Sequence, residues 1–180
     1  MYKNKLIIIL LLFIFTTSFI IGQTLVVGDK AKDFALPYAT KDTIIRAGIK
    51  LSEVIGKKII ILAFYPADWS PGCTQQLCTF RDNFERFSKL DAEILAISGD
   101  YVWSHKNWAE NKNYPFKLLS DHNHKVAKLY ESYNKEYGYN KRTVFVIDTK
   151  GLISYIDWKY DVSGDSSFQN LQKALQNIQR

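Results

Sequence analysis

The sequence predicts one α/β domain, built around a central mixed β-sheet that is flanked by helices. Three short apolar runs are typical of buried strands, because they are rich in β-branched and aromatic residues and end at polar or turn residues. Helical patterns lie between and after these runs. Strands that alternate with helices, followed by a hairpin and a closing helix, indicate a sheet of mixed direction. At 180 residues, of which 47% are hydrophobic, the chain is long enough for one such core.

The strongest predicted strand is 59–65 (IIILAFY), and 93–98 (EILAIS) and 143–148 (TVFVID) share its pattern. The turn sequence TKG joins the third run to 152–158, which predicts a β-hairpin. The earlier stretch 26–40 (VVGDKAKDFALPYAT) is expected to form a short hairpin or an edge segment that leads into the sheet.

Four helices are predicted at 73–89, 102–111, 123–130 and 168–178. The first helix carries one apolar stripe at spacings of three and four, and Leu171, Leu175 and Ile178 lie on one side of the last. The tryptophans are expected to lie in the core or to be partly buried. In the first helix the apolar stripe consists of Leu77, Phe80, Phe84 and Phe87.

The N-terminus is expected to be a targeting segment outside the domain. Two lysines precede an apolar run at 6–21, and the small residue Gly22 follows, which is typical of a secretory signal. We therefore divide the chain into a signal peptide, 1–22, and a domain, 23–180. The run has 16 residues, and a spanning helix needs roughly 20, so a retained membrane anchor is the alternative. Either way the domain is expected to be exported, to a periplasmic or other extracytoplasmic location.

The charge pattern excludes a nucleic-acid partner. Residues 1–22 hold two lysines and no acids, so without them the formal charge falls from +6 to +4. The remaining lysines and arginines are scattered among acids and form no basic stripe. A solvated surface is therefore expected.

The first of the two cysteines, Cys73, lies in the segment 64–78, FYPADWSPGCTQQLC, just after the strongest predicted strand. Open α/β sheets form their sites at the carboxyl ends of strands. Pro66 and Pro71 prevent a continuous regular element, so a shaped loop must lead into the next helix. In the first turn of that helix, free backbone N–H groups and the helix dipole favour an anion such as a thiolate. Ser70 can place a hydroxyl group beside the sulfur.

The second cysteine, Cys78, is five positions further along the same predicted helix. Five helical residues give about 7.5 Å of rise and about 140° of rotation, so the two Cα atoms lie roughly 8 to 9 Å apart. A disulfide needs less than about 7 Å, so a bond between Cys73 and Cys78 requires the first turn to unwind. A reaction cycle with a folded reduced state and a locally unfolded oxidised state would use this geometry.

Other interpretations of the cysteines remain open at this point. Export makes a structural disulfide a plausible alternative, although the helix would have to break for it to form. A thiol-disulfide exchanger would be expected to carry C-x-x-C, and only C-x-x-x-x-C is present. A soft-metal site is a further alternative. Its added ligands would come from Asp121, His122, His124 and His105.

The cysteine segment resembles the active site of peroxiredoxins of the alkyl hydroperoxide reductase/thiol-specific antioxidant family. Their signature of a proline, three residues, Thr or Ser, two residues and the peroxidatic cysteine corresponds to Pro66, Ser70 and Cys73. Cys78 stands where the bacterioferritin-comigratory (PrxQ) subgroup has its resolving cysteine. Arg142, in KRTVFVID, matches the arginine beside a late strand. The likeness runs from VVGDKAKDFALP through FRDNFERF and SHKNWAENKNYPFKLLSD, but threonine is commoner than serine at 70, and many members of the subgroup are cytoplasmic.

The resemblance implies a thioredoxin-like fold and a thiol-dependent peroxidase that works without a metal or an organic cofactor. Cys73 would attack hydrogen peroxide or an organic hydroperoxide, and Cys78 would then form a disulfide that a thioredoxin-like partner reduces. Arg142 would stabilise the thiolate and the leaving oxygen, Ser70 would orient the peroxide, and Pro66 would shield the sulfur. A monomer is expected, with a dimer as the alternative. The alternative function is an exported thiol-disulfide exchange or metal-binding module with a thioredoxin-like fold.

Overall fold

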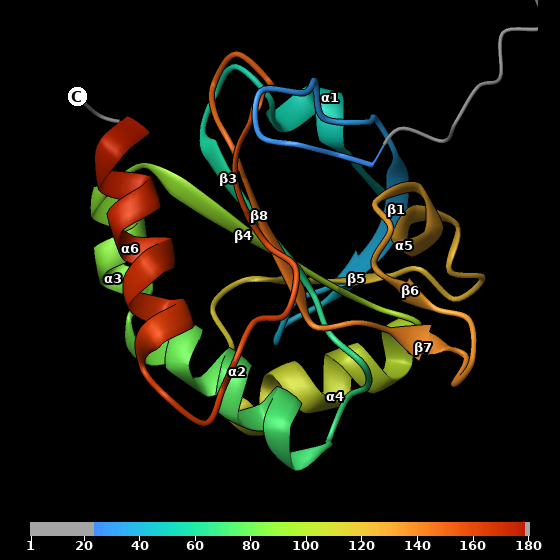
Figure 1. The fold of residues 1–180 in the computed structure, drawn as a ribbon. Helices are drawn as coiled ribbons and strands as arrows, with labels where there is room; N and C mark the ends of the chain where they lie inside the picture. Colours follow the sequence, from blue (N-terminus) through green and yellow to red (C-terminus); the bar gives the residue numbers. More distant parts are fainter. Residues whose placement is uncertain (1–23, 179–180) are drawn as a thin grey trace, which may run out of the picture.

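The structure, a computed structural model, describes residues 24–178 and shows a mixed β-sheet with helices on both faces (Figure 1). The predicted signal peptide or anchor, 1–22, lies outside the described residues. Within the described part, no helix has the length and apolar character needed to cross a membrane. The strands of the sheet, in spatial order, are β2 (Ile44–Lys50), β1 (Ala35–Ala39), β5 (Lys117–Ser120), β4 (Ala92–Ser98), β3 (Ile59–Phe64), β8 (Thr143–Ile147) and β9 (Ile153–Asp157).

Helices cover both faces of this sheet (Figure 1). The helices are α1 (Leu51–Val54), α2 (Pro71–Asp82), α3 (Phe84–Lys89), α4 (Val102–Lys112), α5 (Lys125–Leu129) and α6 (Ser166–Ile178). Side chains of α2, α3, α4 and α6 pack on one face, and those of α1 and α5 pack on the other. A small separate hairpin is formed by β6 (Tyr133–Asn134) and β7 (Tyr139–Asn140).

Strand β3 lies inside the sheet, parallel to β4 and antiparallel to β8. All six of its residues are buried. Ile61 and Ala63 point into the core under α2, whereas Leu62 and Phe64 point into the opposite core. A strand that is buried on both faces has a continuous apolar sequence, and β3 was therefore the strand most strongly predicted from the sequence.

The predicted strands β3, β4 and β8 are confirmed, and so is the hairpin that joins β8 to β9. The N-terminal stretch contributes β1, which pairs with β5 and with β2 near the edge of the sheet. Strand β2 was not predicted, because its sequence, IIRAGIK, is half exposed and shows neither a buried run nor a strict alternation.

The prediction of one helix over 73–89 is wrong, because the chain breaks at Asn83 into α2 and α3. The backbone of Asn83 leaves the helical region, with φ −110° and ψ 13°, and its side-chain amide donates to the carbonyl of Thr79. Asparagine competes for backbone groups in this way, which favours helix ends. The helices predicted at 102–111, 123–130 and 168–178 are confirmed as α4, α5 and α6, with shifted ends.

The expectation that the tryptophans are core or partly buried holds for Trp108 alone, which is fully buried. Trp69, Trp103 and Trp158 are exposed. Trp103 lies on α4, where the guanidinium of Arg46 stacks over its ring at 5.6 Å. The guanidinium covers one face of the indole, so the exposed ring of Trp103 still makes a favourable contact outside the core.

Candidate active site

The site forms where the carboxyl end of β3 meets the amino end of β8. These strands are antiparallel, and Phe64 pairs with Thr143. Arg142, which precedes β8, is therefore brought beside the loop that follows β3. That loop leads into α2, in which Cys73 is the third residue. Two segments that are 69 positions apart in sequence thus meet at one edge of the sheet.

Cys73 is fully buried in the core between the sheet and α2. The guanidinium of Arg142 donates to its sulfur, with 3.5 Å between Nη1 and Sγ. A fixed positive charge at this distance, together with the free N–H groups of the first helical turn, stabilises negative charge on the sulfur. The structure therefore brings Arg142 and Cys73 together, as the sequence analysis expected.

Gln76 is a site residue that the sequence analysis missed. Its Oε1 accepts a hydrogen bond of 2.7 Å from the same Nη1 of Arg142. The side chain is buried, and its Nε2 has no hydrogen-bond partner in the described structure. The sequence could have indicated this residue, because Gln76 lies three positions after Cys73 and residues three apart on a helix share a face.

Ser70 and Pro66 lie on the loop ahead of Cys73, and both are half-buried. The hydroxyl of Ser70 donates to the carbonyl of Ala67 at 3.1 Å. Its proton is therefore directed at the loop backbone and not at the sulfur, while its oxygen keeps its acceptor capacity. Ser70 also begins α2, because its carbonyl accepts the N–H of Thr74 at 2.8 Å. The expected roles of Ser70 and Pro66 toward a peroxide stay predictions.

Cys78 lies on the same unbroken helix as Cys73, and both are free thiols. The sulfur of Cys78 is half-buried and lies 3.9 Å from the hydroxyl of Tyr114. Burial, and to a smaller extent Cys78 itself, raises the pKa of Tyr114 well above its usual value, so its hydroxyl keeps its proton. This folded arrangement matches the geometry inferred from the sequence, and the disulfide between the two cysteines stays a prediction.

The residues considered for a metal site have separate partners. His105 is fully buried against Asp68, whereas His122 and His124 bond to a backbone carbonyl and to an asparagine side chain. Asp121 accepts a backbone N–H of α5. Among residues 24–178, no three or more His, Cys, Asp or Glu side chains are grouped so that they could hold a metal ion.

Comparison with known proteins matches residues 27–156 to the AhpC/TSA family. The chain belongs to this family. Peroxiredoxin Bcp of Bacillus subtilis is 41% identical over 137 residues, which is 73% of this chain and 83% of that protein. The chloroplastic peroxiredoxin Q of Triticum aestivum is 40% identical over 131 residues, which is 72% of this chain but only 59% of that protein. These relatives place this AhpC/TSA protein in the Q/Bcp subgroup, which confirms the resemblance drawn from the cysteine segment.

Solved structures agree with this assignment. The peroxidoxin BcpB of Mycobacterium tuberculosis superposes with a TM-score of 0.72 and 29% identity, over 84% of this chain and 97% of the other. The reduced 2-Cys peroxiredoxin of Plasmodium vivax gives a TM-score of 0.76 at 24% identity, which supports the fold alone. The AhpC/TSA protein therefore has the expected thioredoxin-like fold, with a central mixed sheet flanked by helices.

Proposed function

We propose that this chain is a thiol-dependent peroxidase that reduces hydrogen peroxide and organic hydroperoxides through Cys73. The observation that carries the proposal is the contact of 3.5 Å between the Arg142 guanidinium and the Cys73 sulfur, in the first turn of a helix. Membership in the AhpC/TSA family supports the same activity. The alternative function, thiol exchange or metal binding, is not favoured, because the relatives of this chain are named peroxiredoxins.

In the proposed cycle the thiolate of Cys73 attacks one peroxide oxygen. The O–O bond breaks, and the leaving oxygen departs as hydroxide or alkoxide and takes up a proton, which leaves a sulfenic acid on Cys73. Arg142 stabilises the charge on the sulfur and on the leaving oxygen. Ser70 orients the peroxide, and Pro66 keeps bulk water from the sulfur.

Cys78 completes the cycle as the resolving residue. Its sulfur attacks the sulfenic sulfur, an S–S bond forms and water leaves. The first turns of α2 must unwind for this step, because both cysteines lie on one helix. An external dithiol then reduces the disulfide, and we assign this role to a thioredoxin-like protein.

Location and assembly are also part of the proposal. The apolar run at 6–21 with its preceding lysines supports export, either as a signal peptide or as a membrane anchor. An exported enzyme is out of reach of the cytosolic thiol pool, so the reductant would be a thioredoxin-like partner on the same side of the membrane. The proposed unit is a monomer, because both cysteines of the cycle belong to one chain.

Stopped-flow mixing of the reduced protein with hydrogen peroxide tests the proposal. The parent is expected to oxidise rapidly, and Cys73→Ser is expected to lose the reaction. Cys78→Ser is expected to form a sulfenic acid on Cys73 with one equivalent of peroxide and no intramolecular disulfide, and further equivalents are expected to carry Cys73 to the sulfinic and sulfonic acids. If Cys73→Ser reacts as fast as the parent, the assignment fails.

A further inference from the structure

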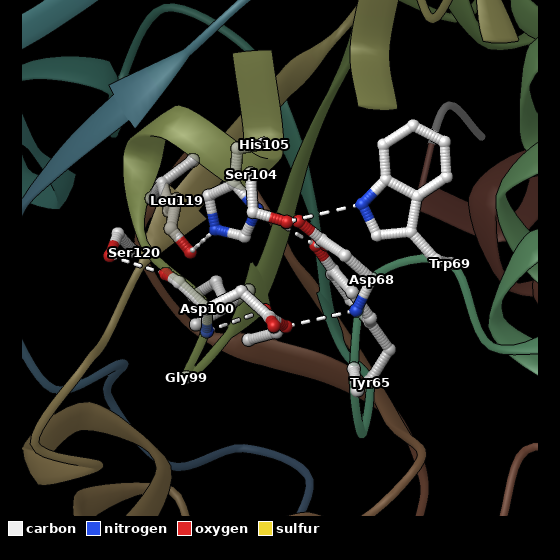
Figure 2. Close-up of polar contacts among 12 residues, drawn as sticks. Tyr65, Asp68, Trp69, Gly99, Asp100, Ser104, His105, Leu119 and Ser120 are labelled. Carbon is white, nitrogen blue, oxygen red and sulfur yellow. Dashed lines mark hydrogen bonds and ion pairs between the residues drawn. The ribbon is translucent and has the colours of Figure 1, made fainter. Parts of the chain in front are cut away.

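A fully buried acid–base pair joins the loop between β3 and Cys73 to helix α4 (Figure 2). Asp68 of this loop contacts His105 of α4, with 2.9 Å between Oδ2 and Nδ1, and neither side chain is exposed. The hydroxyl of Tyr65 donates to the other carboxylate oxygen at 2.8 Å. Burial, together with the charge of Asp68, raises the pKa of Tyr65 well above its usual value, so it remains a donor. None of these three residues takes part in the chemistry proposed for Cys73.

Both ring nitrogens of His105 have a partner. Its Nε2 lies 3.2 Å from the carbonyl of Leu119, and its Nδ1 lies 2.9 Å from the carboxylate of Asp68. Leu119 belongs to β5, so the buried imidazole lies between this strand and the loop that carries Asp68. Polar groups that are buried and partnered in this way rigidify their surroundings.

The backbone of the same loop is held at a second point. The N–H of Asp68 donates to the carboxylate of Asp100 at 2.9 Å, and the hydroxyl of Ser98 donates to the same oxygen at 2.7 Å. The indole N–H of Trp69 donates to Ser104 of α4 at 3.3 Å (Figure 2). The stretch from Tyr65 to Trp69 is thus fixed both to α4 and to the end of β4.

The fixed stretch ends where the chain changes direction. Trp69 has φ +64°, in the left-handed region that a non-glycine residue adopts only when its surroundings hold it there. Beyond it, the contacts of Ser70 and Thr74 are short-range ones within the loop and the first turn of α2. Trp69 therefore separates an anchored segment from the helical turns that must unwind.

We propose that Asp68 and His105 are positioning residues for the reaction of Cys73. Their buried pair fixes the loop that places Pro66 and Ser70 around the sulfur. The pair also confines the unwinding of α2 to the residues after Trp69. This inference rests on the proposed peroxidase function. Removing one member leaves the other buried without this partner, so the loop loses its buried anchor and is held by its contacts to Asp100 and Ser104. Misplacement of a reacting group by about 1 Å costs on the order of 100-fold in rate. The disulfide step needs the first turns of α2 to unwind and does not depend on the placement of this loop, so it is not slowed.

Two substitutions at one position test the proposal. Asp68→Ala removes the anchor. Asp68→Asn retains it, because the amide keeps the shape of the carboxylate, accepts from Tyr65 with its oxygen and faces His105 with its N–H group. Glu110→Gln, which neutralises an exposed ion pair on the same α4, is the matched control. In the stopped-flow trace, the phase that depends on peroxide concentration reports Cys73 oxidation, and the later, peroxide-independent phase reports disulfide formation.

Asp68→Ala is expected to slow the first phase by at least about tenfold and to leave the second unchanged or faster. Asp68→Asn and Glu110→Gln are expected to stay within about twofold of the parent. A merely structural pair would lower the unfolding midpoint and leave the rates of the folded protein unchanged. The proposal is overturned if Asp68→Ala, folded by circular dichroism, oxidises as fast as the parent. A parent that consumes no peroxide refutes the proposed function itself, which is a distinguishable result.

Hydrogen exchange on the parent gives a test that does not depend on a variant folding. The N–H groups of Tyr65 and Asp68, bonded to Ile97 and Asp100, are expected to stay protected when the protein is oxidised. The N–H of Thr74, bonded to Ser70, is expected to lose protection. Equal loss of protection at Asp68 and Thr74 would show that the anchor opens with the helix, and the proposal would then be wrong.

Discussion

Single side chains set the electrostatics of the site. One nitrogen of Arg142 donates to both Cys73 and Gln76. Gln76, which fixes the position of the guanidinium, therefore lies on the same helix as the Cys73 sulfur. Gly72 lies against this guanidinium, and a Cβ built there would be 3.1 Å from Nη2. The absence of a side chain at 72 thus leaves the space that Arg142 occupies.

Gly72→Ala is expected to slow the oxidation of Cys73 without destabilising the protein. The added methyl group displaces the Arg142 guanidinium by a few tenths of an ångström, which we expect to cost about 2- to 10-fold in rate. Alanine is favoured over glycine in a helix by about 1 kcal/mol, so the unfolding midpoint in urea should not fall. Gly164→Ala is the control, because its Cβ would make only an ordinary contact at 3.8 Å. Equal rates for Gly72→Ala and the parent would contradict the role given to Arg142.

At the scale of elements, α2 carries both cysteines, and the proposed cycle requires its first turns to unwind. Its exposed face is tied to the segment before α6 by Gln75, whose Nε2 donates to the carbonyl of Val162 at 2.6 Å. This bond joins the turn that unwinds in the proposed cycle to a part of the chain outside α2. We therefore expect it to oppose disulfide formation without acting on the sulfur of Cys73.

Gln75→Ala is expected to accelerate the disulfide step and to leave the peroxide step unchanged. Loss of one hydrogen bond contributes about 0.5–1.5 kcal/mol, or about 2- to 10-fold, and the low end applies to an exposed residue. The two stopped-flow phases separate the steps. Gln176→Ala, at an exposed glutamine of α6, is the control. A slower disulfide step in Gln75→Ala would show that the bond to Val162 guides the transition and does not oppose it.

The elements that could be predicted from the sequence are those marked by a pattern within their own residues, such as an apolar run or a pair of prolines. Strands β3, β4 and β8 are buried throughout or nearly so, and the loop into α2 is marked by Pro66 and Pro71. The edge strand β2 lacked such a signal. Arg142 reaches Cys73 only because β8 runs antiparallel to β3, a pairing that no local pattern specifies, so its place came from the family resemblance alone. The contact between Asp68 and His105, 37 positions apart, depends on the same tertiary arrangement.

The whole molecule depends on two cores separated by the sheet. The site draws on the core under α2, whereas Asp121 lies buried just after the carboxyl end of β5, where it accepts the N–H of Ala127 of α5 at 2.7 Å. Burial raises the pKa of Asp121 above its ordinary value, although backbone hydrogen bonds partly oppose the shift. A raised carboxyl pKa stabilises the fold below about pH 3.9, and this contribution is lost as the pH rises through the folded-state pKa.

Asp121→Asn is therefore expected to be more stable than the parent at pH 7, because it retains an acceptor for Ala127 and buries no charge. The advantage should shrink as the pH falls toward about 4, because the folded-state carboxyl, with its raised pKa, takes up its proton before an ordinary carboxyl does. Urea unfolding of both reduced proteins at pH 4, 5.5 and 7 measures the difference. A variant that is less stable at pH 7, with a gap that narrows on acidification, would show that the ionised carboxylate is favoured in the folded state.

The central claim is that Cys73 reacts with peroxide and that Cys78 then resolves it within the same chain. Both cysteines lie in one tryptic peptide, 59–81, so a bond between them changes the mass of a single fragment. Mass analysis of the reduced protein before and after one equivalent of hydrogen peroxide tests the claim most directly. We predict that this peptide loses two hydrogens and that the other peptides keep their mass. An unchanged mass, or added oxygen without the loss of two hydrogens, would contradict it.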